Sequence, residues 1–131
     1  MSLALYSVAD QTAFITLNRP EKRNALSPEL VTELKAAFNK AEEDPAVKVV
    51  VLKANGESFC AGADLGYLQQ PQNFSFEENL ADSNHLKELF LKIYTLNKVV
   101  IAQVQGHALA GGCGLAAVCD FTFAVPEAKF G

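Results

Sequence analysis

The sequence predicts an α/β fold in which parallel strands are joined by right-handed helical crossovers. Three observations carry this prediction: a strand-like hairpin opens the chain, three further strand-like runs follow it, and helical segments separate those runs. Alternation of this kind is typical of parallel sheets. We see no repeat, no low-complexity tract and no linker, so we treat residues 1–131 as one domain.

The first elements are a hairpin and a helix. Residues 3–9 and 12–17 are rich in strand formers, and the two residues between them predict a tight turn. After a polar loop at residues 18–26, Ser27-Pro28-Glu29 combines a capping serine, a first-turn proline and an acid, which predicts a helix start. Pro45 is expected to end that helix. Its predicted apolar face comprises Leu30, Leu34, Phe38 and Ala41.

The remaining elements alternate. Residues 47–53 are β-branched enough to predict a strand buried on both faces. A capping-box pattern at residues 75–78 predicts the next helix. A second buried strand is expected at 99–104, then a short helix to about residue 119 and a third strand at 120–125. The apolar side of the longer helix comprises Leu86, Leu89, Phe90, Ile93 and Leu96.

Composition narrows the function classes. A net charge of −4 argues against nucleic acid as a partner. The three cysteines form no CxxC pair, so we expect reduced thiols in a cytoplasmic protein and no metal site. The first residues lack a charged region followed by an apolar one, so we expect no secretory signal. Residues 99–119 carry no charge, but their glycines and polar residues favour a strand, a loop and a helix over a membrane span.

Two glycine-rich loops, at residues 59–64 and 106–114, each follow a predicted strand directly. Open α/β sheets bind ligands at the carboxyl ends of their strands, so the loops are expected to meet over one site. Gly111 and Gly112 begin a helix, whose unpaired N–H groups stabilise an anion. Two converging N–H donors are what an enolate-forming or acyl-transfer site requires.

Other interpretations of these loops remain open. Each could be only a tight strand-to-helix connection whose glycines allow close packing. Residues 112–117 also fit a loose G-x-G-x-x-A nucleotide pattern, but the acid expected about 20 residues later and the lysine of a P-loop are missing. His85 and His107 are lone histidines, for which surface and packing roles, respectively, are the expectation.

Three segments together resemble the signatures of the crotonase (enoyl-CoA hydratase/isomerase) superfamily: residues 18–26, 59–65 and 106–120. The resemblance implies a ββα spiral fold and an acyl-coenzyme A thioester as substrate. It places the N–H groups of Ala61 and Gly111 in an oxyanion hole. Coenzyme A itself is expected only as part of the substrate, with no further cofactor. The positions implied to contact substrate or coenzyme A are Lys22, Arg23, Ala25, Ala63, Asp64, Leu65, Gly112 and Gly114.

Some of these roles have alternatives. Lys22 and Arg23 suit phosphate binding, but both could be solvated surface charges. Asp64 could instead cap a helix. Gly114 stands where the two-glutamate hydratases carry a catalytic acid, a variation that resembles the bacterial methylglutaconyl-CoA hydratases of leucine breakdown.

By the same resemblance, the chain is a truncated N-terminal portion. It stops about three residues short of the family's second glutamate and lacks the helices that build a trimer or a dimer of trimers. The activity implied is hydration of a 2-enoyl-CoA through an enolate, and the fragment itself is expected to be inactive. The alternatives within the family are an isomerase, thioesterase or decarboxylase. A non-catalytic acyl-CoA-binding subunit is the alternative of another class.

Overall fold

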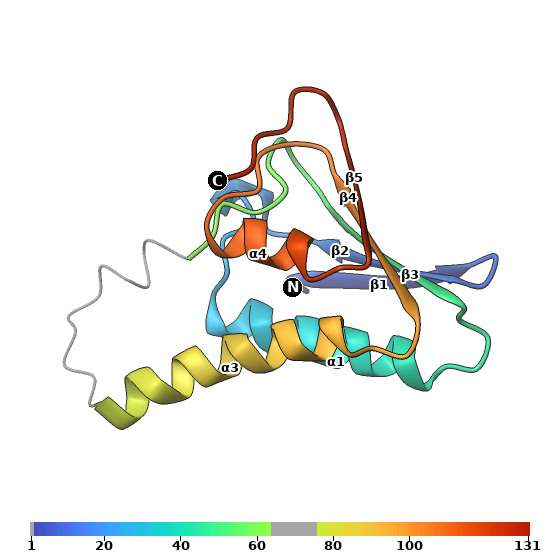
Figure 1. The fold of residues 1–131 in the computed structure, drawn as a ribbon, viewed down its shortest axis with the longest axis horizontal. Coiled ribbons are helices and arrows are strands. Elements are labelled where there is room, and N and C mark those ends of the chain that lie inside the picture. Colours follow the sequence, from blue (N-terminus) through green and yellow to red (C-terminus); the bar gives the residue numbers. More distant parts are fainter. Residues whose placement is uncertain (1, 64–75) are drawn as a thin grey trace.

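The computed structural model describes residues 2–63 and 76–131. Its five strands form one sheet in the order β1-β2-β3-β4-β5, in which β1 is antiparallel to β2 and all other neighbours are parallel. The predicted α/β class is therefore confirmed (Figure 1). The elements are β1 (Ala4–Ala9), β2 (Thr12–Leu17), η1 (Pro20–Lys22), α1 (Pro28–Glu43), β3 (Val49–Ala54), α3 (Phe76–Tyr94), β4 (Val99–Val104), α4 (Gly111–Ala117) and β5 (Phe121–Ala124).

The local signals near the N-terminus act as predicted. Asp10 and Gln11 have positive φ angles of 50° and 63°, which suits the two-residue turn between β1 and β2. Ser27 accepts a hydrogen bond from the Leu30 amide at 3.2 Å and so caps α1. The helix ends at Glu43, before Pro45, and all four residues predicted for its apolar face are buried.

In the part of the chain that the structure describes, helices cover one face of the sheet. Figure 1 shows α1 and α3 side by side below the strands, and both helices contact each other. In β3, Val50 and Leu52 are fully buried, whereas the side chains that alternate with them are only half-buried. The prediction that this strand is buried on both faces is therefore wrong.

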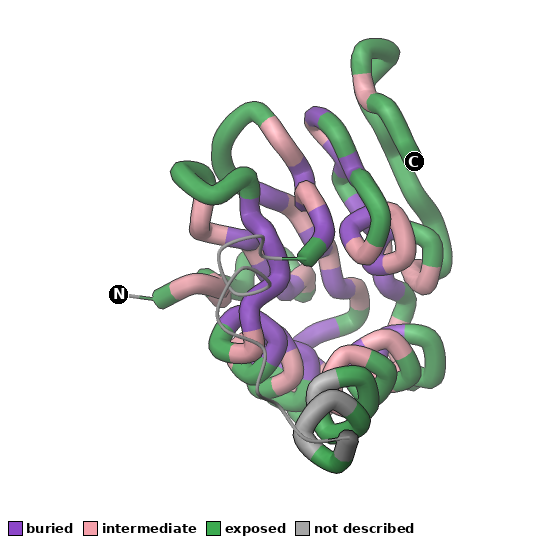
Figure 2. Tube along the Cα trace, turned by 90° about the vertical axis from the view of Figure 1, so that its left-hand side faces the viewer, coloured by how far each residue is buried: buried purple, intermediate pink, exposed green. Residues whose placement is uncertain are grey.

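The strand order explains this one-sided burial. Each parallel connection moves to the next strand in the same direction, and right-handed crossovers then place successive helices on the same face. Strand β4 likewise buries alternate residues, and all of β5 is exposed. Figure 2 shows the same gradient, with burial concentrated in the inner strands and the C-terminal segment exposed.

Residues 99–119 fold as the predicted strand, loop and short helix. Within the described ranges, no helix is long and apolar enough to cross a membrane. Ser75 lies outside the described residues, so the predicted capping box is not placed.

Candidate functional site

The two glycine loops meet, as predicted. The carbonyl of His107 accepts hydrogen bonds from the amides of Phe59 at 3.0 Å and Cys60 at 3.1 Å. Cys60 and Ala108 also form a parallel bridge. Segments almost 50 residues apart in sequence therefore run side by side beyond the ends of β3 and β4.

Glycine is required where these loops touch most closely. A Cβ on Gly112 would lie only 2.2 Å from the carbonyl oxygen of Cys60, and one on Gly106 would lie 1.8 Å from that of Glu57. Neither contact is possible for a larger residue without moving backbone. These two glycines set how near the loops can approach each other.

A third segment, the loop before α1, is pinned to the same place. The Leu26 amide donates to the carbonyl of Gly62 at 2.7 Å. The fully buried Asn24 side chain donates to the carbonyls of Asn55 at 2.9 Å and Ser58 at 3.0 Å, and accepts from the Arg19 amide. Sequence reasoning missed this anchoring role, because a single asparagine in a polar loop gives no sign that it is buried.

The amide of Ala61 is not free. It donates to the carbonyl of Arg23 at 3.0 Å, and an amide hydrogen held by one carbonyl is not available to a thioester oxygen. This pairing conflicts with the oxyanion role that the resemblance implied for Ala61, although the Ala61 residue itself does lie at the site.

Two other backbone amides nearby have no hydrogen-bond partner among the described residues, and we call them open amides. Ala63 is exposed, and its N–H has no hydrogen-bond partner among the described residues. Gly111 is the first residue of α4, and its N–H likewise has no partner there. The two belong to loops in contact, since a Cβ on Gly62 would lie 3.5 Å from the Gly111 nitrogen.

The turn into α4 is strained. Ala110, the residue before Gly111, has φ 50° and ψ −119°, a conformation that residues with a side chain rarely adopt. Such a residue costs on the order of 1–3 kcal/mol and persists only where the surrounding structure fixes it. Strain at this position marks the Gly111 amide as a candidate functional group.

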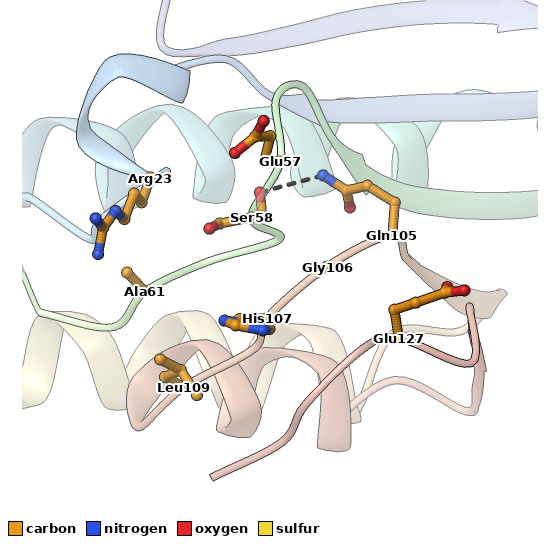
Figure 3. A pocket seen from close by; sticks show the side chains of 9 residues that line it. All are labelled: Arg23, Glu57, Ser58, Ala61, Gln105, Gly106, His107, Leu109 and Glu127. Atoms are coloured by element: carbon orange, nitrogen blue, oxygen red, sulfur yellow. Dashed lines mark hydrogen bonds between the residues drawn. The ribbon is translucent and has the colours of Figure 1, made fainter.

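A cavity of about 430 Å³ opens beside the loops. Figure 3 shows Arg23 and Ala61 on one side of it and Glu127 on the opposite side, with His107 between them. His107 is exposed, so the packing role expected for it is wrong. The residues lining the cavity are Arg23, Glu57, Ser58, Ala61, Gln105, Gly106, His107, Leu109 and Glu127.

The other predicted contact residues lie in different environments. Lys22, at the end of η1, is exposed but does not line the cavity. Ala25 and Gly112 are buried, so a ligand could reach at most their backbone. Gly114 is half-buried beneath Phe90. Asp64 and Leu65 lie outside the described residues.

The thiols of Cys60 and Cys119 are poor nucleophiles. Burial raises the pKa of Cys60 to about 11, an effect partly offset by the Gly62 amide that contacts its sulfur. Burial, assisted by the charge of Asp120, raises the pKa of Cys119 to about 12. Both thiols are protonated at neutral pH, which fits packing as small apolar groups.

Comparison with known proteins agrees with the predicted family and fold. The enoyl-CoA hydratase/isomerase family matches residues 8–131. A crotonyl-CoA hydratase of Syntrophomonas wolfei is 39% identical over 93% of this chain and 46% of its own. A mitochondrial enoyl-CoA hydratase of Pongo abelii is 42% identical over 88% of this chain and 38% of its own.

Solved structures give the same result. The crystal structure of an enoyl-CoA hydratase/isomerase from Xanthobacter autotrophicus superposes with a TM-score of 0.95 at 36% identity, covering 99% of this chain and 48% of that one. The chain thus spans about half the length of the relatives that it matches. It belongs to the enoyl-CoA hydratase/isomerase family, the crotonases.

Proposed function

We propose that this chain contributes the thioester-binding loops of an enzyme that hydrates 2-enoyl-CoA. Because the matched relatives are about twice as long, we assign the activity to a full-length protein that contains this chain. The observation that carries the proposal is the pair of open amides, Ala63 and Gly111, on two loops in contact. Family membership supplies the reaction class.

In this proposal the thioester carbonyl oxygen accepts hydrogen bonds from the Ala63 and Gly111 amides. Ala63 replaces Ala61 as the first donor, because the Ala61 amide already donates a hydrogen bond to the Arg23 carbonyl. Water adds at the β carbon, negative charge collects on the thioester oxygen as an enolate, and the α carbon then takes a proton. Backbone donors aimed at that oxygen stabilise the developing charge, each typically worth about 10²–10³-fold in rate.

Proton transfer needs a separate group. Gly114 carries no side chain and cannot supply it. By the family resemblance, we propose a carboxylate located after Gly131 in the full-length protein. General acid–base assistance is typically worth about 10²–10⁴-fold, so the 131-residue chain alone should not turn over.

The cavity beside the loops is our candidate for part of the coenzyme A site. Arg23 lines it and offers a guanidinium for a phosphate, and the exposed Lys22 is its sequence neighbour. No cofactor beyond the coenzyme A of the substrate is invoked. A methylglutaconyl-CoA substrate, a trimeric assembly and a cytoplasmic location are the narrower parts of this proposal, and they rest on the resemblance alone.

The test is steady-state hydration of crotonyl-CoA by the full-length protein. Gly111→Pro should lower kcat by about 10²–10³-fold, because proline removes the donor. Cys113→Ala, two residues along the same helix, should stay within about twofold of the wild type. Equal loss in both variants, with the fold intact by circular dichroism, would show that the loop serves packing alone.

One observation favours a second function. Since Gly114 lacks an acid, the same oxyanion hole could serve an isomerase that moves a proton along the acyl chain. Supplying a 3-enoyl-CoA distinguishes the two: a hydratase leaves it unchanged, whereas an isomerase converts it to the 2-enoyl thioester without adding water.

A further inference from the structure

The contact between Gly114 and Phe90 is unusually close. A Cβ on Gly114 would lie 3.1 Å from Cε2 and 3.3 Å from Cζ of Phe90. Carbon atoms pack best at roughly 3.5–4.0 Å. The Phe90 ring therefore occupies the space in which a side chain at position 114 would begin.

This contact lies one helical turn from the proposed oxyanion donor. Gly111 and Gly114 are three residues apart on α4 and so lie on neighbouring turns of one face. Phe90 comes from α3, where Leu89 and Ile93 are fully buried and anchor the helix to the core. Phe90 itself is half-buried.

We propose that Phe90 determines which acyl groups the site accepts, an inference that rests on the proposed function. A thioester oxygen held at the Gly111 amide directs the acyl chain past the next turn of α4. There Gly114 offers only hydrogen, and Phe90 offers an aromatic surface. Next to its double bond, the acyl group therefore meets an aromatic wall, which limits the length and branching of the substituents that fit there.

The pairing of the two residues can be tested without any activity. The change in Tm on Gly114→Ala should be less favourable in the wild-type background than without the ring, because the added methyl meets Phe90. In a Phe90→Ala background the same change should be neutral or raise Tm, since alanine favours a helix more than glycine does. Equal Tm changes in both backgrounds would show that the ring does not fill this space.

The catalytic test uses crotonyl-CoA, 2-octenoyl-CoA and 3-methylcrotonyl-CoA. Phe90→Ala should raise kcat/KM for the two larger substrates relative to crotonyl-CoA by about tenfold, as expected for space gained in an apolar pocket. Tyr94→Ala, the matched control one turn along α3 on an exposed residue, should leave that ratio unchanged.

The results distinguish a failure of the proposed function from a failure of the role proposed for Phe90. A wild-type protein that hydrates none of the three substrates contradicts the proposed function. An active wild type whose preference is the same with Phe90→Ala contradicts only the role of Phe90.

Discussion

Individual glycines in the two loops have separable roles. Gly112 touches the Cys60 carbonyl so closely that a Cβ would lie 2.2 Å away, whereas the nearest atom to a Cβ on Gly111 would be the end of the Leu26 side chain at 3.2 Å. Gly112 therefore serves packing, and Gly111 serves mainly through its amide. Sequence alone does not separate these two adjacent residues.

We predict that Gly112→Ala lowers the free energy of unfolding by about 1–3 kcal/mol, the usual range for overpacking. Gly111→Ala should cost less than about 1 kcal/mol, because a leucine methyl can move aside, and it retains the amide donor. Urea denaturation of both variants measures the difference. Equal losses would mean that the backbone at Cys60 yields as easily as the Leu26 side chain.

The choice between Ala61 and Ala63 also belongs to the residue scale. Both stand in one small-residue loop, and the motif resemblance favoured Ala61. The pairing of this loop with residues 23–26 decides which of the two amides is hydrogen-bonded within the chain. That register forms only in the folded chain. This part of the site could not be predicted from the sequence.

At the scale of elements, local signals predicted the helices and strands well. The Ser27 cap, the two-residue turn at Asp10 and the run of apolar residues in α1 depend on neighbours in sequence, and all are confirmed. Burial on the second face of β3 depends instead on which side the crossover helices take. For that reason the β-branched composition of β3 led to the wrong prediction that both of its faces are buried.

The ends of α1 and α3 are joined by an ion pair. The Lys92 ammonium bonds to the Glu42 carboxylate, which also accepts from the Asn97 amide at 3.2 Å. The hydrogen bond from Lys92, followed by that from Asn97, lowers the pKa of Glu42. The charged carboxylate thus ties α3 and the turn after it to the first helix.

We predict that Glu42→Gln lowers the free energy of unfolding by up to about 1 kcal/mol at pH 7, as expected for a partly exposed pair. Because the pKa is depressed by folding, this stabilisation is complete above the unfolded value of about 4.3 and is lost as pH falls through the folded value. Glu42→Gln and wild type should therefore converge in strong acid. Glu43→Gln, the exposed neighbour, is the control, and a difference that stays constant down to acid pH would contradict the assignment.

At the scale of the whole molecule, the 131-residue chain presents apolar surface on its sheet. Phe121 is 57% exposed and Phe123 is 64% exposed, and both lie on the edge strand β5. Exposed apolar edge strands promote pairing with other chains.

We predict that the 131-residue chain self-associates when produced alone, and that changing both Phe121 and Phe123 to lysine suppresses this. Leu91→Lys, on the exposed side of α3, should have a smaller effect, because a helix satisfies its own backbone hydrogen bonds. Light scattering over a concentration series measures the average mass of the wild-type chain and of both variants, and so their self-association. A wild-type chain that stays monomeric throughout would contradict the prediction.

The meeting of loops almost 50 residues apart is the whole-molecule feature that the sequence did predict. It followed from two parallel strands that end at the same edge of a sheet, and the bridge between Cys60 and Ala108 confirms it. The cavity lined by His107 and Glu127 did not follow from any motif, because its walls come from segments with no shared pattern.

The most direct test of the central claim is a crystal structure of the full-length protein with a bound acyl-CoA. We expect the thioester oxygen to lie about 2.7–3.1 Å from the amide nitrogens of both Ala63 and Gly111. The Ala61 amide should still donate to the Arg23 carbonyl. A thioester oxygen bound by the Ala61 amide, or one far from Gly111, would contradict the account.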